Sequence, residues 1–252
     1  MSFIDMNIAT NRRSRQIRIA SLNMQCGKKL MRVLNEFDAP HLAACDIILL
    51  QETETVGSLN QAELLALQLG CVMSYLPARF TRRGTHGLAI LSKYPISDIE
   101  TLALPRNELL INTRDRVAMA ATITLDDQQL RVYNVHLDTR INAERRQRQL
   151  SPVIAAANAY PHLPTIIGGD FNTFSRHHTL RIDLAMSRAG FASPFFYGRH
   201  YTADYLLWRP QLDWIYARKL RVLKARVERD SYCSDHKPIW IDATFHHLSA
   251  SL

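Results

Sequence analysis

Apolar residues along this chain recur at two spacings, one typical of strands and one typical of helices. Gln16–Asn23 places Ile17 and Ile19 on one face and Arg18 on the other, which predicts a strand. Lys28–Asp38 carries apolar residues at helical spacing. Further strands are predicted at Asp46–Gln51, Val72–Leu76, Gly87–Ser92, Thr165–Gly168, Leu212–Tyr216, Leu220–Glu228 and Pro238–Phe245, and further helices at Gln61–Leu69 and Thr179–Ala189.

Two further segments contain residues that interrupt a regular strand or helix pattern. Val117–Leu125 and Gln129–Val135 flank Asp126–Asp127, a pattern that predicts a β-hairpin with a tight polar turn. Ala143–Ala159 reads as a helix, but proline lacks the backbone N–H that a helix interior requires. We therefore expect Pro152 to kink or divide this helix.

Strand and helix patterns interleave from beginning to end, and no repeat or Gly/Pro/Ser-rich linker divides the chain. Hairpins mixed with helical crossovers favour two packed sheets with helices outside over one doubly wound sheet. We expect an α/β protein with a single domain at residues 17–246. A basic N-terminal extension, residues 1–16, would precede it, and a short tail, residues 247–252, would follow.

Composition narrows the class of protein. A hydrophobic fraction of 47% and a charged fraction of 21% exclude a disordered chain. Lys and Arg number 31 against 23 Asp and Glu, and the resulting charge of +8 suits a polyanionic partner, although solubility alone also explains such a charge. No apolar run approaches the ~20 residues of a membrane span, so we expect no integral membrane association. The four cysteines are far apart and fit reduced thiols in a cytoplasmic protein.

Candidate chemistry lies where the predicted strands end. Asn23, Gln51-Glu52 and His136 each follow an apolar strand, and Gly169-Asp170-Phe171-Asn172 and Ser234-Asp235-His236 lie beside two others. Such polar residues are often only turn formers. Asp213 is harder to dismiss, because it lies inside an apolar strand and an unpaired buried carboxylate costs several kcal/mol. Asp213 therefore needs a partner.

Taken in order, these blocks resemble the endonuclease/exonuclease/phosphatase superfamily. The resemblance rests on Ser21-Leu22-Asn23, Gln51-Glu52, Gly87–Ser92, Val135-His136-Leu137, Gly169-Asp170-Phe171-Asn172, Leu212-Asp213-Trp214-Ile215 and Ser234-Asp235-His236. It implies a four-layered α/β sandwich, with two central mixed sheets flanked by helices and an active site where strand ends meet. It also implies hydrolysis of phosphate esters with a divalent metal, Mg²⁺ or alternatively Mn²⁺.

The resemblance implies a metal site as well. Glu52 would be the main ligand, with Asn23 and Asp235 binding directly or through water. Oxygen ligands suit magnesium or manganese, and the absence of a Cys/His ligand set counts against zinc.

The remaining motif residues would then carry catalysis. Asp170 would orient or deprotonate the attacking water, with Asn172 beside it to hold the phosphate. His236, oriented by Asp213, would contact the phosphoryl oxygens. His136 would donate to a phosphate oxygen or assist the leaving group.

Three functions remain open. We favour a nuclease acting on DNA or RNA, because the net charge of +8 suits a polyanionic substrate. Three arginines just before the Gly87–Ser92 strand, Arg79, Arg82 and Arg83, could bind a phosphate backbone. The alternative is a sphingomyelinase-like or inositol-phosphate phosphohydrolase, for which Trp208, Trp214, Tyr201 and Tyr205 would line a pocket unless they belong to the core. The third is a non-catalytic binding module, against which the retention of every motif carboxylate argues. Substrate choice should reside in the loops between motifs, Gly198–Pro210 among them.

Overall fold

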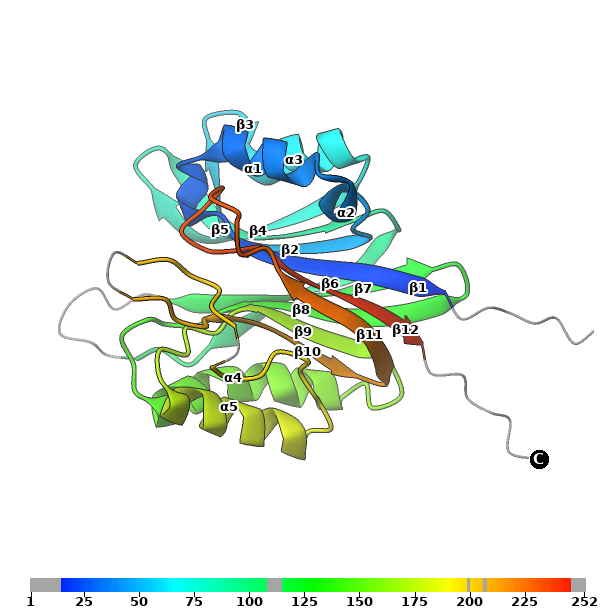
Figure 1. The fold of residues 1–252 in the computed structure, drawn as a ribbon, viewed down its shortest axis with the longest axis vertical. Coiled ribbons are helices and arrows are strands. Elements are labelled where there is room, and N and C mark those ends of the chain that lie inside the picture. The colour runs from blue at the N-terminus through cyan, green and yellow to red at the C-terminus, as the bar shows by residue number, and fades with distance from the viewer. Residues whose placement is uncertain (1–14, 108–114, 199, 206–207, 246–252) are drawn as a thin grey trace, which may run out of the picture.

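Two β-sheets pack face to face at the centre of the fold, and helices cover both outer faces (Figure 1). The computed structural model describes residues 15–107, 115–198, 200–205 and 208–245. The first sheet has the order β11-β12-β1-β2-β5-β4, with β3 paired to β2, and the second has the order β10-β9-β8-β7-β6. The predicted four-layered α/β sandwich is confirmed.

The first sheet and its helices come mainly from the N-terminal half of the chain. Its strands are β1 (Gln16–Asn23), β2 (Ile47–Val56), β3 (Leu59–Asn60), β4 (Val72–Thr81), β5 (Gly84–Ser92), β11 (Leu220–Val227) and β12 (Ile239–Phe245). On its outer face lie α1 (Leu30–Phe37), α2 (Pro40–Ala43) and α3 (Gln61–Leu69), preceded by the short 3₁₀ turn η1 (Gln25–Gly27).

The second sheet is built from β6 (Ile96–Leu104), β7 (Arg116–Leu125), β8 (Gln128–His136), β9 (Thr165–Asp170) and β10 (Asp213–Arg218). Its outer face is covered by α4 (Ala143–Asn158) and α5 (Arg176–Arg188). Both sheets are mixed, because β1 pairs with β2 and β8 with β9 in parallel, whereas their other strand pairs are antiparallel. Each parallel pair is joined by a helical crossover.

Strand β1 shows how the sheets use both faces. Ile17 and Ile19 pack into the large core that contains the inner faces of both sheets, whereas Ala20 and Leu22 pack with the residues of α1 to α3. Successive side chains of a strand point to opposite faces, so a strand covered on both sides must be apolar on both.

Pro152 does not divide the predicted helix, since α4 runs through it from Ala143 to Asn158. The missing N–H leaves the carbonyl of Arg148 without its helical donor. The hydroxyl of Ser151 donates to that carbonyl at 2.7 Å and so satisfies it.

Other elements differ from expectation at their edges. Strand β4 extends to Thr81, so Arg79 belongs to a strand and only Arg82 and Arg83 lie in the turn before β5. Strand β6 was not predicted, because it is a mostly exposed edge strand with little apolar pattern. The predicted extension and tail fall almost entirely outside the described residues.

No helix in the described ranges combines the length and the apolar character that crossing a membrane requires.

Candidate active site

The strand ends of both sheets meet at one edge of the sandwich. The register places Asn23 beside Gln51 in the first sheet. In the second sheet it pairs His136 with Asp170, and Asp170 with Asp213. Seven of the eight predicted site residues come from these ends or from the adjoining loops: Asn23, His136, Asp170, Asn172, Asp213, Asp235 and His236. The eighth, Glu52, lies within β2.

A β-bulge in β2 aims Glu52 at the opposite sheet. Regular pairing with β5 holds up to Leu50 and resumes at Thr53, so Gln51 and Glu52 together face one residue of β5. Glu52 has a φ of 51°, in the left-handed region that side chains other than glycine rarely adopt. Bulges beside active sites redirect a side chain. The carboxylate of Glu52 thereby comes to lie 3.7 Å from Nε2 of His136.

Asn134 ties the two sheets together at this bulge. Its Nδ2 donates to the carbonyls of Leu50 at 2.8 Å and Ala89 at 2.9 Å, and its Oδ1 accepts from Nε2 of Gln51 at 2.8 Å. The side chain is fully buried. Two residues of β8 therefore serve the site, with Asn134 fixing the bulge and His136 facing it. Asn134 was not among the predicted site residues.

The carboxylate of Asp170 is the centre of the cluster. Its Oδ2 accepts from Nδ2 of Asn23 at 3.1 Å and lies 3.5 Å from Nε2 of His136 and 4.0 Å from Nε2 of His236. Its Oδ1 accepts from the backbone N–H of Asn172 at 2.9 Å. Four other predicted residues thus converge on the carboxyl group of Asp170.

Asp213 has the partner that its burial demands. Its Oδ2 lies 2.8 Å from Nδ1 of His236, and both side chains are buried. Burial alone lowers the pKa of His236, but the charge and hydrogen bond of Asp213, together with the charges of Asp170 and Asp235, raise that pKa to about 10. His236 is therefore an imidazolium at neutral pH, and its Nε2 proton faces the cluster.

The pKa of Asp170 is raised to about 7. Burial is the main cause, because it disfavours the charged carboxylate. The positive charge of His236 opposes this rise, and the negative charge of Asp213 adds to it. A carboxyl group with such a pKa can take up or release a proton near neutral pH.

The protonation of His136 follows from its neighbour Arg116. Nη1 of Arg116 lies 3.2 Å from Nδ1 of His136, and a guanidinium can only donate. Nδ1 therefore accepts, so the proton of a neutral imidazole lies on Nε2, toward Asp170 and Glu52. Arg116 is held in turn by Asp138, to which its Nε donates at 2.9 Å. Neither Arg116 nor Asp138 was predicted, since neither belongs to a motif block.

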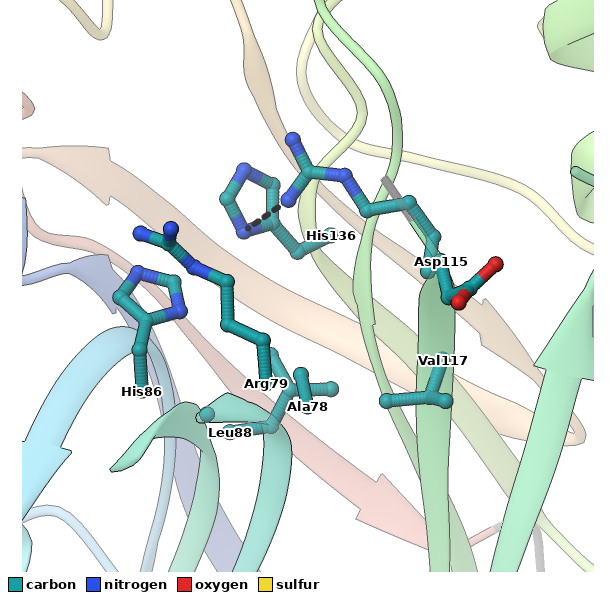
Figure 2. Close-up of a pocket in the computed structure, with 9 residues that line it drawn as sticks. Ala78, Arg79, His86, Leu88, Asp115, Val117 and His136 are labelled. Carbon is teal, nitrogen blue, oxygen red and sulfur yellow. Dashed lines mark hydrogen bonds between the residues drawn. The ribbon is translucent and has the colours of Figure 1, made fainter. Parts of the chain in front are cut away.

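Beside His136 lies a small cationic pocket, which we call the arginine pocket (Figure 2). Its polar lining comes from Arg79, His86, Arg116 and His136, while Asp115 at its rim points away from the histidines. Nε of Arg79 is buried and has no hydrogen-bond partner in the described part of the chain. Two guanidinium groups beside a site histidine make this pocket suitable for an anion.

Asn172 is buried, adopts a φ of 51°, and donates from Nδ2 to the carbonyl of Leu137 at 2.8 Å. This bond joins the end of β9 to the end of β8. Strained backbone at Glu52 and at Asn172 is the kind that accumulates at functional sites.

The three predicted metal ligands offer oxygen atoms in an acidic setting. Gln25 connects two of them, because its backbone N–H donates to Oδ1 of Asn23 at 2.9 Å and its Nε2 donates to Oδ2 of Asp235 at 2.8 Å. The side chain of Glu52 is 27% exposed, and its closest hydrogen-bond donor among the described residues is the weak thiol of Cys26 at 3.4 Å.

Four carboxylates crowd this edge of the fold, and they repel one another. Burial raises the pKa of Tyr205, and the negative charges of the four add to that rise: Asp170, Asp235, Asp213 and Glu52. A hard divalent cation would relieve this repulsion, so the oxygen-rich donor set fits Mg²⁺ or Mn²⁺.

Two groups of potential metal-binding atoms, each with its atoms within 4.8 Å of one another, occur in the described residues: Asp170, Asp213 and His236, and Cys26, Glu52 and His86. Neither group is the predicted set of Asn23, Glu52 and Asp235, of which only Glu52 belongs to one of them. Burial, with the charge of Glu52, raises the pKa of the Cys26 thiol to about 12. In the metal-free protein that thiol is therefore protonated at neutral pH.

Comparisons with known proteins give one consistent picture. A sequence profile of the Endonuclease/Exonuclease/phosphatase family matches residues 20–236. The UPF0294 protein VV2535 of Vibrio vulnificus is 30% identical over 120 residues, which are 47% of this chain and 41% of that protein, so the match spans less than half of the curated relative.

Two solved structures share the fold. The human Nocturnin catalytic domain with bound sulfate anion has a TM-score of 0.72 at 22% identity, over 92% of this chain and 94% of that one. A protein of the same family description from Leptotrichia buccalis has a TM-score of 0.72 at 16% identity, over 91% of this chain and 100% of that one.

Proposed function

The chain belongs to the Endonuclease/Exonuclease/phosphatase family, and on this premise we propose that it is a divalent-metal-dependent hydrolase of phosphodiester bonds in DNA or RNA. Phosphoester hydrolysis is the chemistry of the family. The observation that carries the proposal is the convergence of His136 and His236 on the carboxylate of Asp170, with Glu52 3.7 Å from His136. A phosphodiester repels nucleophiles, so its hydrolysis needs positive charge at the phosphoryl oxygens and an activated water.

Three residues at this carboxylate-rich edge of the fold would hold the metal: Glu52, Asn23 and Asp235. When bound there, Mg²⁺ neutralises charge on the phosphate. The bulge holds Glu52 toward that position, and Gln25 holds Asn23 and Asp235. These contacts support the proposal because they restrict the side chains of the three proposed ligands before a metal binds.

Asp170 would orient the attacking water and accept its proton. Its raised pKa of about 7 makes it a base that works near neutral pH, where proton transfer is most efficient. Asn23 and Asn172 donate to its two oxygens and fix its orientation. The side-chain amide of Asn172 has a second N–H, which would donate to the phosphate.

The two histidines would hold the phosphoryl group. His236 is kept cationic by Asp213 and presents its Nε2 proton to the cluster. His136 also presents an Nε2 proton toward Oδ2 of Asp170, with its tautomer set by Arg116. Fixed donors aimed at developing negative charge are usually the largest contribution to catalysis.

A nucleic-acid substrate is supported by charge. The chain has a formal net charge of +8, and the arginine pocket places Arg79 and Arg116 beside His136. Guanidinium groups bind phosphate oxygens with several parallel hydrogen bonds. The related Nocturnin domain was solved with a bound sulfate, a tetrahedral anion like phosphate. A cytoplasmic location is part of the same proposal, and the four free cysteines support it.

The test is a panel of single- and double-stranded DNA, RNA, sphingomyelin and inositol phosphates, assayed with and without Mg²⁺ and Mn²⁺. We expect metal-dependent cleavage of nucleic acid, and losses of at least ~10²-fold in Asp170→Ala, Glu52→Ala and His236→Ala with the fold retained. Preference for sphingomyelin vesicles or inositol phosphates would replace the substrate assignment. Binding of nucleic acid with no turnover under any metal would make the protein a binding module.

A further inference from the structure

Aromatic rings are exposed along one rim of the candidate site. Ring centroids of Phe174 and Trp208 lie 5.5 Å apart at an interplanar angle of 29°, and those of Tyr205 and Trp208 lie 6.3 Å apart at 28°. We call these three stacked residues the aromatic ladder. Trp208 is 46% exposed and Tyr205 39%, whereas Trp214 and Trp240 are buried in the core. The ladder is therefore not part of the core packing.

The ladder is joined to the candidate site at both ends. The backbone N–H of Phe174 donates to the carbonyl of Asn172 at 3.1 Å. On the other side, the N–H of Asp204 donates to the carbonyl of Asp235 at 2.8 Å, and Ala203 forms a β-bridge with His236. Phe174 and Tyr205 thus follow directly on segments that are fixed to the site residues.

Exposed aromatic rings beside a site favour ligands with a flat aromatic face, because two such faces can stack. A nucleobase has a π-face that stacks on aromatic side chains, and this contact tolerates any base sequence. An inositol ring and an acyl chain have no such face. In a duplex, neighbouring base pairs cover both faces of each base, so a base must leave the stack before it can meet a protein ring.

We propose that the aromatic ladder stacks an unpaired nucleobase beside the scissile phosphate, which makes single-stranded nucleic acid the preferred substrate. The inference rests on the proposed function and adds to it the strandedness of the substrate and the residues that select it. Both other rings stack on Trp208, so Trp208 supports the two outer rings, Phe174 and Tyr205, whose free faces would stack the base.

The experiment measures binding in EDTA, where no turnover occurs. Fluorescence anisotropy compares three probes that carry the same remote label: a short single strand of DNA, the same strand in a duplex, and a base-free strand of tetrahydrofuran phosphates. The base-free strand carries the same backbone charge, so it isolates the contribution of the rings. We expect the wild-type protein to bind the single strand about tenfold more tightly than the base-free strand.

Variants assign this preference to the ladder. Trp208→Leu keeps apolar bulk but lacks a π-face, and we expect it to bind the single strand and the base-free strand equally. Trp208→Phe should restore most of the difference. Tyr160→Ala removes a comparably exposed ring from the loop after α4, at the far end of β9, and should leave the difference unchanged.

Equal wild-type binding of the single strand and the base-free strand overturns the inference, as does tighter binding of the duplex. A Trp208→Leu variant that weakens both strands by the same factor also overturns it, because that result indicates a structural role. Failure of the proposed function is a separate result, namely no metal-dependent cleavage of any probe by the wild-type protein. The binding comparison in EDTA does not depend on it.

Discussion

Oδ2 of Asp213 lies 2.8 Å from Nδ1 of His236, and neither side chain is exposed to solvent. Asp213 is the first residue of β10 in the second sheet, and His236 precedes β12 in the first. The pair therefore bridges the two halves of the sandwich. Removing one partner of a buried charge pair leaves the other uncompensated, so both charge state and position of His236 depend on Asp213.

The first prediction concerns the pH profile of kcat/KM for a phosphodiester in saturating Mg²⁺. Without metal the pKa values of Asp170 and His236 are about 7 and about 10. A nearby Mg²⁺ favours the loss of both protons. We therefore expect activity to rise at or below about pH 7 as Asp170 loses its proton, and to fall at or below about pH 10 as His236 loses its own. Asp213→Asn removes the charge that raises the pKa of His236, so the alkaline limb should move to lower pH and neutral-pH turnover should fall by at least ~10²-fold. Asp183→Asn, a control that removes a carboxylate bonded to Tyr216, should keep both limbs. An alkaline limb that stays in place in Asp213→Asn contradicts the assignment.

The second prediction concerns stability of the metal-free protein. The pKa of His236 is raised on folding from 6.5 to about 10, so its stabilising contribution is complete below about pH 6.5 and is lost as pH rises through about 10. The pKa of Asp170 is raised from 3.8 to about 7, so its contribution too falls as pH rises, between about 4 and 7. Urea unfolding in EDTA should therefore show a free energy that declines from pH 6.5 to 10. His236→Gln should flatten that decline, and an unchanged slope in this variant would disprove the link.

The sequence could predict the sandwich because hairpin patterns are mixed with helical crossovers along the chain and because the motif blocks resemble a family with that fold. It could not predict β6, whose burial pattern is that of an edge strand. In α4 the hydroxyl of Ser151 replaces the backbone donor that Pro152 lacks, a contact that helical periodicity does not encode.

Some residues of the candidate site could likewise be predicted from the sequence, and others could not. Asp213 could be singled out because a carboxylate in an apolar strand needs a partner, and the structure supplies His236. Arg116, Asn134 and the ladder residue Phe174 could not, because their roles come from contacts between segments far apart in sequence. Trp214, one of the four aromatic residues named above as a possible pocket lining, is fully buried in the core.

The third prediction concerns metal binding. Glu52→Gln removes a charge from the acidic edge but keeps the size of the side chain, so the Mg²⁺ concentration for half-maximal activity should rise at least tenfold. The rise in Tm that a fixed Mg²⁺ concentration produces should also shrink, because a bound ligand stabilises the folded protein by RT ln(1 + [L]/Kd). Glu54→Gln, two residues along β2, is the matched control and should behave like the wild type. Equal Mg²⁺ requirements in the two variants would remove Glu52 from the metal site.

The fourth prediction concerns the arginine pocket. Each phosphate contact releases counterions, so removing one should reduce the salt dependence of nucleic-acid binding by about one unit of log–log slope. We expect this reduction for Arg79→Gln, with weaker binding at low salt. Arg221→Gln removes an exposed arginine from β11, remote from the pocket, and should change little. A slope in Arg79→Gln equal to that of the control would exclude the pocket from substrate binding.

The last prediction tests Asn134, which joins the sheets at the bulge. Asn134→Leu keeps the volume but leaves the carbonyls of Leu50 and Ala89 buried without their side-chain donor. Each such loss costs ~1–3 kcal/mol, so we expect a total of about 3 kcal/mol in urea unfolding. Asn142→Ala removes only the N-cap of α4 and should cost about 1 kcal/mol.

Because Gln51 also loses its bond to Asn134, the bulge that aims Glu52 should loosen, and the Mg²⁺ requirement of Asn134→Leu should rise as well. The N-cap variant should leave that requirement unchanged, since α4 does not contact the bulge through Asn142. Loss of stability alone, with wild-type Mg²⁺ dependence in the folded Asn134→Leu protein, would show that Asn134 supports the sandwich and not the position of Glu52.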